Sequence, residues 1–327
     1  MLLNDKKMEG IGNLMIYNDF GNADFKVSDV GFGAWAIGGT AWGGGRQDDD
    51  AKAALKASLE AGINFYDTCD SYGDGHSEEL IGEFFKGIRK EAIIVTKGGT
   101  NFRVPERNKN FTRDYLMMSL DESLQRLQTD YVDVYLLHVP DSKWQDEADV
   151  LRTMDEIKKS GKARYCGLAM WGAADTLHAL ENDKNGTIEA IECPFNILNK
   201  SNIEVVRIAK ERDIPVFTSQ PLASGILTGK YGVDTKFGDG DNRKGFWSKE
   251  RFESVQEDMK IIEECVKETG MKMNELALAY NLSYPGICSV IPGAKNADQV
   301  IKNTAASGKR LSESIMKKLS ATKGFVF

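Results

Sequence analysis

Histidine and paired cysteine are scarce in this chain. Its 327 residues include three histidines and five cysteines, and no two cysteines lie at a Cys-x-x-Cys spacing. A zinc centre draws most of its ligands from clustered cysteine and histidine, so we expect no metal site. The cysteines are odd in number and far apart, and Cys166, Cys193 and Cys288 lie in apolar runs. These features favour reduced thiols, three of them packed as small core residues.

Long apolar runs and clusters of positive charge are also missing. No stretch approaches the roughly 18 apolar residues that a membrane span needs, and residues 1–7 lack the apolar stretch of a signal peptide. The formal net charge is −7 and the lysines and arginines are scattered, which argues against nucleic acid as a partner. We therefore expect a cytoplasmic protein that binds neither membrane nor nucleic acid. Its oligomeric state stays open.

Short apolar runs alternate along the chain with longer amphipathic stretches. The alternation predicts strands at 30–34, 64–67, 93–96, 132–137, 164–168, 190–193, 216–219 and 289–292. It predicts helices at 48–60, 77–85, 112–127, 146–160, 173–180, 203–212, 253–269, 274–283 and 297–306. Thr112 and Ser77 occupy predicted N-cap positions, and Gly161 and Gly270 suit left-handed helix ends.

Alternation of eight strands with helices is typical of a closed parallel barrel. The strands are continuously apolar, which favours a parallel sheet, and eight units favour closure into a (β/α)8 TIM barrel. Before them, apolar residues flank Asp19-Phe20-Gly21-Asn22, a hairpin signal. We expect this N-terminal β-hairpin to close the barrel bottom. With no repeat or boundary, residues 1–327 are expected to form a single domain, with a mobile loop at 236–245.

Four chemically active residues stand at or just past the carboxyl ends of predicted strands. Asp67 ends the second strand, Tyr72 follows in its loop, Lys97 ends the third strand and His138 ends the fourth. In such a barrel these strand ends meet at one rim. A tyrosine pKa near ~10 makes a poor acid at neutral pH, and a nearby ammonium is expected to lower it. A tyrosine with a lowered pKa is suited to protonating an alkoxide. The hydride must then come from a cofactor.

Each of these residues also has an ordinary structural interpretation when taken alone. Tyr72 fits a surface loop, Lys97 a strand-end ion pair and Asp67 a loop cap, while His138 is evenly balanced between the two kinds of role. The combination of all four within their flanking sequences is what favours a proton-transfer site. The same lysine also leaves open a lyase or aldolase that forms a Schiff base on Lys97.

At these residues the chain resembles the aldo-keto reductase family, over about residues 30–319. The likeness is carried by 65–79 around Asp67 and Tyr72, by Val95-Thr96-Lys97, by Leu136-Leu137-His138 and by 123–133. The resemblance implies that Tyr72 is the proton donor, that Lys97 and Asp67 tune it, and that His138 orients the carbonyl. It implies NADPH-dependent reduction of an aldehyde or ketone, or the reverse oxidation of the alcohol.

The resemblance extends to cofactor and substrate segments. Residues 220–231 are similar to the family's pyrophosphate loop and 291–296 to its adenosine-phosphate site, where Lys295 favours NADP over NAD. It implies the cofactor-binding set Ala36, Glu192, Gln220, Leu222, Ser224, Gly225, Lys230, Gly293, Lys295, Gln299 and Asn303. Lys295 also fits a plain solvated lysine. The same resemblance makes Trp35 and Trp42 substrate-pocket walls, suited to aromatic or sugar rings, with Trp144 and Trp171 as weaker candidates.

Three positions depart from the family pattern. Ala169-Met170 stands where the family has Ser-Asn, Glu192 where it has glutamine, and Ser219 where an aromatic residue stacks on the nicotinamide. Alanine and methionine lack the replaced donors and acceptors, whereas Glu192 still offers an acceptor. The departures support a second hypothesis, in which the barrel is a catalytically weak, cofactor-binding regulatory module.

Overall fold

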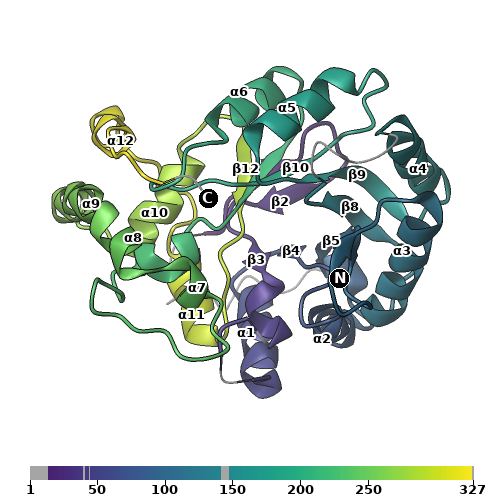
Figure 1. The fold of residues 1–327 in the computed structure, drawn as a ribbon, viewed down its shortest axis with the longest axis horizontal. Coiled ribbons are helices and arrows are strands. Elements are labelled where there is room, and N and C mark those ends of the chain that lie inside the picture. Colours follow the sequence, from purple (N-terminus) through teal and green to yellow (C-terminus); the bar gives the residue numbers. More distant parts are fainter. Residues whose placement is uncertain (1–13, 40, 44, 141–146, 326–327) are drawn as a thin grey trace.

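A single eight-stranded parallel sheet forms the centre of the molecule in the computed structural model, which describes residues 14–39, 41–43, 45–140 and 147–325 (Figure 1). The strands lie in the order β12-β11-β10-β9-β8-β5-β4-β3, so neighbours in space follow the chain. Their bounds are β3 Phe32–Gly33, β4 Phe65–Asp67, β5 Ile93–Gly98, β8 Val132–His138, β9 Ala163–Ala169, β10 Ile191–Pro194, β11 Val216–Ser219 and β12 Ile287–Val290. All eight predicted strands are confirmed.

The sheet closes on itself where its first and last strands meet. Val30 pairs in parallel with Val290, Gly33 pairs with Gly293, and the amide of Gly31 donates to the carbonyl of Val290 at 2.8 Å. Glycine is required at position 33, because a Cβ there would lie 2.7 Å from the backbone oxygen of Ile291. The predicted (β/α)8 barrel is therefore confirmed.

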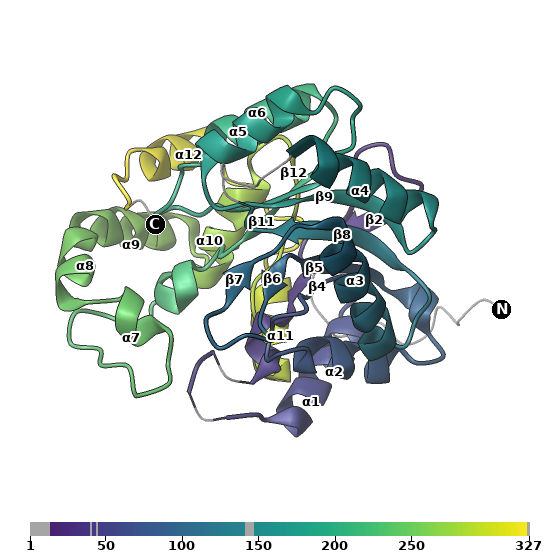
Figure 2. The same cartoon turned by 45° about the vertical axis from the view of Figure 1, so that its right-hand side comes forward.

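Helices surround this sheet and follow its strands (Figures 1 and 2). Their bounds are α1 Asp48–Glu60, α2 His76–Phe85, α3 Arg113–Leu127, α4 Glu147–Lys159, α5 Ala173–Asn182, α6 Ile203–Glu211, α7 Arg243–Phe246, α8 Lys249–Ser254, α9 Gln256–Thr269, α10 Met273–Leu282, α11 Ala297–Thr304 and α12 Glu313–Ser320, with 3-10 turns η1 Ala34–Gly38, η2 Arg89–Glu91 and η3 Ala223–Thr228. Helices α7, α8 and α12 were not predicted. In the described part of the chain no helix has the length and apolar character to cross a membrane.

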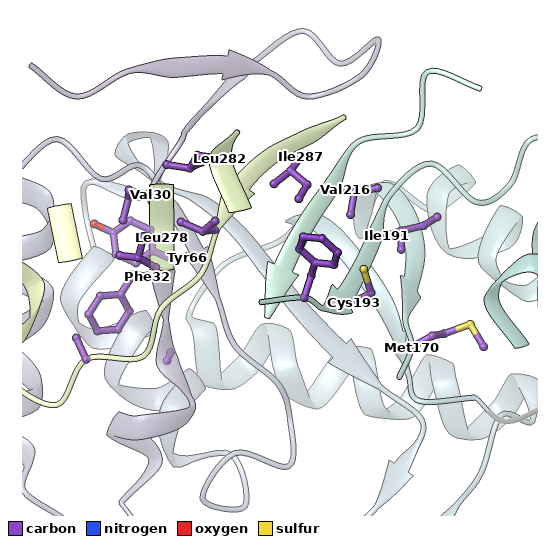
Figure 3. Packing of buried hydrophobic residues seen from close by; sticks show 14 of the residues in the cluster. Val30, Phe32, Tyr66, Met170, Ile191, Cys193, Val216, Leu278, Leu282 and Ile287 are labelled. Carbon is purple, nitrogen blue, oxygen red and sulfur yellow. The ribbon is translucent and has the colours of Figure 1, made fainter. Parts of the chain in front are cut away.

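Two apolar layers hold the barrel together. The larger lies between strands and helices, and Figure 3 shows part of it, from Phe32 and Tyr66 beside Leu278 across to Ile191 and Met170. The smaller fills the barrel interior, with Phe65, Val134 and Phe217 among its fully buried members. Each such side chain contributes about 1.5–3 kcal/mol when it leaves water.

The N-terminal hairpin closes the lower end of the interior layer. Strands β1 Tyr17–Asp19 and β2 Lys26–Ser28 pair antiparallel, as predicted. The turn between them places Phe20, which is 1% exposed, with its ring centroid 5.8 Å from that of Phe65 and 6.3 Å from that of Phe217. The hairpin therefore seals the barrel at the end opposite the carboxyl termini of the strands.

The helix-end predictions were partly right. Gly161 and Gly270 take left-handed φ values of 78° and 67° directly after α4 and α9, as expected. Thr112 precedes α3, but its hydroxyl donates to Asn110 Oδ1 instead of accepting from the helix. The Ser77 prediction was wrong, because Gly75 is the N-cap of α2 and the Ser77 hydroxyl donates to the carbonyl of Ala34 at 3.0 Å.

Two further segments matter for the rim of the barrel. A small antiparallel hairpin, β6 Thr100–Asn101 with β7 Asn108–Lys109, follows β5 and was not predicted. The predicted loop at 236–245 is a loop up to the start of α7, and its Asp241 forms an antiparallel bridge with Trp42. Trp144 lies outside the described residues.

Candidate active site

The structure brings the four predicted site residues together at the carboxyl rim of the barrel. Asp67 is the last residue of β4, Lys97 lies one residue before the end of β5, and His138 ends β8. The Lys97 ammonium donates to Asp67, and its Nζ lies 3.4 Å from Tyr72 Oη. The Tyr72 and His138 rings meet edge to face, with centroids 6.2 Å apart.

Lys97 is completely buried and is surrounded by acceptors. Its Nζ donates to Asp67 and, at 2.8 Å, to the carbonyl of Thr68, and Glu192 Oε2 lies 3.1 Å away. Burial acts to lower the pKa of Lys97, but Asp67 and Glu192 together raise it well above its ordinary value. The lysine is therefore held as an ammonium.

Two buried carboxyl groups face this single ammonium. Asp67 is 2% and Glu192 is 6% exposed, and they approach Lys97 from β4 and β10. Burial, followed by the charge of Glu192, raises the pKa of Asp67 well above its ordinary value, although Lys97 acts in the opposite direction. Two carboxylates and one ammonium would leave a net negative charge in the barrel, which favours the protonated form of Asp67.

The environment of Tyr72 overturns one expectation. Burial raises the pKa of Tyr72 well above its usual value, and Asp67 and Glu192 raise it further. Lys97 does lower it, as expected from the sequence, but not enough to reverse the direction. The expectation of a net lowered pKa was therefore wrong, because that reasoning included the ammonium but neither the burial nor the second carboxylate. The phenol is held in its protonated form.

His138 is held as a neutral imidazole. Burial lowers its pKa well below the usual value, and the charges of Lys109 and Lys97 lower it further. Its Nδ1 lies 3.1 Å from the hydroxyl of Thr100 and 3.3 Å from the thiol of Cys69. Sequence reasoning missed Thr100, Cys69 and Lys109, because their proximity to His138 depends on the β6–β7 hairpin and the loop after β4.

A second buried polar group lies behind the site. Asp70 accepts from Ser119 Oγ at 2.7 Å and from the Cys69 thiol at 3.4 Å. Burial raises the pKa of Asp70 to about 7, helped by the nearby charge of Glu78. A carboxyl group that titrates near neutrality therefore lies next to the thiol that contacts His138.

The residues proposed for the pyrophosphate form a strained turn after β11. Gln220, Ser224 and Gly225 have positive φ values of 52°, 55° and 96°. A right-handed residue followed by a left-handed one turns successive backbone amides toward one side, and Leu222 (φ −104°) followed by Ala223 (φ 47°) is such a pair. Leu222 is half-buried at the start of η3, and Lys230 is exposed just beyond it. Gln220 Oε1 is buried and has no hydrogen-bond partner among the described residues.

The residues proposed for the adenosine end gather around the loop after β12. Asn303 donates to the carbonyl of Gly293 at 3.4 Å, and Gln299 Oε1 accepts from the amide of Lys295 at 2.9 Å. The Lys295 ammonium lies 5.7 Å from the Trp42 ring centroid, and burial, with the charge of Arg243, lowers its pKa. A cleft opens here, and its lining includes Ala36, Trp42 and Lys295.

Tryptophans border the tyrosine side of the rim. The Trp35 ring centroid lies 4.9 Å from that of Trp42 and 6.3 Å from that of Tyr72. Trp35 is 36% exposed, so part of its face is open to a ligand. Trp171, in the loop after β9, is 53% exposed and makes no ring contact with this pair.

The departures from the family pattern have clear positions. Ala169 and Met170 are 4% and 2% exposed, and Met170 packs in the outer apolar layer (Figure 3). Ser219 ends β11 and is half-buried. Glu192 Oε2, like Gln220 Oε1, is buried without a hydrogen-bond partner among the described residues, although it pairs electrostatically with Lys97. Buried oxygens left in this way fit a ligand that brings hydrogen-bond donors, as a carboxamide does.

Together these features fit a nicotinamide dinucleotide. The strained turn suits a pyrophosphate, and Lys295 at the adenosine end suits a further anionic group. Gln220 Oε1, just past the end of β11, is an acceptor without a partner among the described residues, and Glu192 on β10 pairs with the buried ammonium. These residues therefore fit the nicotinamide cofactor that the sequence led us to expect.

Comparisons with known proteins agree with this architecture. A family model described as the aldo/keto reductase family matches residues 29–323. The chain is 30% identical over 295 residues to the aldo-keto reductase YhdN of Bacillus subtilis (strain 168), covering 88% of this chain and 87% of that protein. It is 29% identical over 305 residues to a probable voltage-gated potassium channel subunit beta of Oryza sativa subsp. japonica, covering 89% and 91%.

A solved structure is similar over nearly the full length. The holo form of the aldo-keto reductase AKR11C1 from Bacillus halodurans superposes with a TM-score of 0.81 at 26% identity. The superposition covers 96% of this chain and 98% of that one. The likeness therefore includes the barrel and its surrounding helices.

Proposed function

The chain belongs to the aldo/keto reductase family, and we propose that it transfers a hydride between NADP(H) and an aldehyde or ketone, or the corresponding alcohol. NADP-dependent hydride transfer is the general activity of this family of oxidoreductases. The observation that carries the proposal for this chain is the 3.4 Å separation of Tyr72 Oη from a buried, paired lysine ammonium. That pairing gives the rim a proton donor whose conjugate base is stabilised.

Tyr72 is the general acid and base in this proposal. When bound, the nicotinamide supplies or accepts the hydride. In reduction, Tyr72 Oη gives its proton to the substrate oxygen as negative charge develops there, and the phenolate that remains is stabilised by the Lys97 ammonium. In oxidation, the phenolate takes the proton from the alcohol. Asp67 holds Lys97 in place, and His138 directs a hydrogen bond at the substrate oxygen.

The pKa directions at the site support reduction. A phenol whose pKa is raised by burial is protonated at neutral pH, which is the form that reduction needs. A neutral His138, whose pKa is lowered by burial, donates a hydrogen bond without adding positive charge beside Lys97.

The proposed cofactor site runs from Glu192 and Gln220 to Lys295. In this proposal Glu192 binds the nicotinamide end, Gln220, Leu222, Ser224, Gly225 and Lys230 bind the pyrophosphate, and Gly293, Lys295, Gln299 and Asn303 bind the adenosine end, with Ala36 in the cleft beside Lys295. The positive charge of Lys295 favours the extra phosphate of NADP over the free hydroxyl of NAD. Trp35 and Trp42 form the proposed wall of a pocket for an aromatic or sugar-like carbonyl compound.

The decisive experiment mixes the purified chain with NADPH and a panel of small aldehydes. We expect cofactor consumption that Tyr72→Phe abolishes, since a phenylalanine cannot transfer the proton. Tyr165→Phe, which changes a tyrosine of β9 away from this cluster, serves as the matched control and should retain turnover. Undiminished activity of Tyr72→Phe would rule out Tyr72 as the acid.

A second candidate function is a cofactor-binding regulatory module with little turnover. It is favoured by the similarity to a protein described as a probable voltage-gated potassium channel subunit beta, and by Ala169, Met170 and Ser219 at the nicotinamide end. Tight NADPH binding without consumption across the panel would support this candidate.

The geometry argues against a Schiff-base lyase or aldolase. Such an enzyme needs a neutral amine, whereas Asp67 and Glu192 raise the pKa of Lys97 well above its ordinary value. We therefore expect borohydride to trap no carbonyl substrate on this lysine.

A further inference from the structure

A closed ring of hydrogen bonds ties the β6–β7 hairpin to His138. The Lys109 ammonium donates to the Thr100 hydroxyl at 2.8 Å and to the backbone carbonyl of His138 at 2.6 Å. The Thr100 hydroxyl in turn lies 3.1 Å from His138 Nδ1. Lys109 and Thr100 face each other as cross-strand partners in the hairpin, so one small element delivers both. We refer to Lys109, Thr100 and His138 as the His138 ring.

The chemistry of the donors decides the direction of these bonds. An ammonium only donates, so Thr100 Oγ accepts from Lys109 and has its own proton to place. Among the described residues, the acceptor in reach of that proton is His138 Nδ1. The Cys69 thiol on the other side of Nδ1 is also protonated, because burial raises its pKa well above the usual value. The single thiol proton already has an acceptor in Asp70 Oδ1, so the Thr100 hydroxyl is the neighbour that donates to Nδ1.

We propose that Lys109 and Thr100 are positioning residues that fix His138 in the tautomer with its proton on Nε2. With Nδ1 occupied as an acceptor, the neutral imidazole carries its hydrogen on the other nitrogen. In the alternative tautomer Nδ1–H points at the Thr100 hydroxyl, which already accepts from Lys109 and has its own proton to place. The bond from Lys109 to the His138 carbonyl also holds the end of β8 against the hairpin. The consequence for catalysis rests on the proposed function: Nε2–H is the donor that a substrate carbonyl meets.

The same ring helps to keep His138 neutral. The charged or titratable groups that face the imidazole are Lys109 from β7, Lys97 from β5, and Cys69 and Tyr72 from the loop after β4. Both lysines are cationic and oppose protonation of the ring, as its burial does. Removing the charge of Lys109 should therefore raise the His138 pKa without creating a new hydrogen bond.

Histidine-selective ¹⁵N NMR of the full chain tests the tautomer without any turnover. Three histidines are present, and a His138→Asn variant identifies the signals of interest by their loss. We expect wild-type His138 with Nδ1 unprotonated and Nε2 protonated at pH 8. Thr100→Val should raise the Nδ1–H population about tenfold, the effect of one lost hydrogen bond, whereas Thr100→Ser keeps the wild-type tautomer. A wild-type Nδ1–H signal, or a Thr100→Val spectrum identical to wild type, would overturn the proposal.

Titration of the same signals tests the role of the charge. Lys109→Met should raise the His138 pKa by about 0.5–1 unit, while Lys109→Arg should leave it in place. In the carbonyl reductase assay, Thr100→Val and Lys109→Met should lower kcat/KM about tenfold with the NADPH Kd within about twofold of wild type. If His138 titrates identically in Lys109→Met and wild type, Lys109 has no role in keeping His138 neutral. If the chain proves inactive while the NMR results hold, the proposed function fails and the tautomer assignment stands.

Discussion

Glu192 directs its carboxylate at the ammonium of Lys97, 3.1 Å away, from a strand on the far side of the barrel from Asp67. The family resemblance places this residue at the nicotinamide. In the structure it is also a second counter-ion to the lysine beside the proposed acid. One ammonium therefore serves two buried carboxyl groups and a phenol, and burial together with these charges sets the pKa directions of Asp67, Tyr72 and Lys97.

Replacing Glu192 by glutamine should make Tyr72 easier to ionise. The substitution removes one negative charge that raises the pKa values of Tyr72, Lys97 and Asp67. We expect the loss of reductase activity at high pH, followed as kcat/KM against pH, to move to lower pH by about one unit. Glu189→Gln is the control, because that carboxylate pairs with Lys158 instead. An unshifted profile would mean that Glu192 does not act on Tyr72.

Asp70 should make the protein less stable as the pH rises toward neutrality. Burial raises its pKa to about 7 in the folded state, from 3.8, so the folded protein binds this proton more tightly than the unfolded chain does. The stability that this group contributes is complete below about pH 4 and is lost as the pH rises through about 7. In thermal unfolding between pH 5 and 8, Asp70→Asn should therefore lose less Tm than wild type. Asp114→Asn, an exposed change, should follow wild type.

Phe20 should be a stability residue with no part in the chemistry. It closes the bottom of the barrel at the end opposite Tyr72, and Phe20→Ala should cost about 3–5 kcal/mol of unfolding free energy in denaturant titrations. Phe25→Ala, in the same hairpin but only half-buried, should cost clearly less. The folded fraction of Phe20→Ala should retain its kcat. A loss of kcat in the folded protein would contradict a purely structural role for Phe20.

Lys295 should decide between the two nicotinamide cofactors. In fluorescence titrations with NADPH and NADH, Lys295→Met should weaken NADPH binding by about tenfold or more, since a charge-assisted contact with phosphate is lost. NADH binding should change little. Lys302→Met is the matched control on α11, where that lysine pairs with Asp298 at the surface. Tighter binding of NADH than NADPH by the wild type would show that the role given to Lys295 is wrong.

The barrel was predictable because its strands are buried on both faces. Such strands read as continuous apolar runs between amphipathic helices, and each of the eight was found close to its predicted place. The missed elements carry weaker patterns. Strands β6 and β7 have two polar residues each, and α12 buries Ile315 and Leu319 in a short, charged stretch.

Position along the chain was also enough to bring Asp67, Tyr72, Lys97 and His138 to one rim, because parallel strands share a carboxyl end. Ser77 shows the limit of local patterns. Its hydroxyl was expected to cap a helix, but it donates to the carbonyl of Ala34, which is remote in sequence.

The sequence by itself determined the barrel, the hairpin at its base and the residue types at its rim, because these follow from the spacing of apolar residues along the chain. Tertiary structure alone decided that Glu192 reaches Lys97, that the Tyr72 pKa rises instead of falling, and that Thr100 and Lys109 meet His138. These outcomes depend on burial and on distances of about 3 Å between strands and loops remote in sequence, and such distances exist only once the sheet has closed.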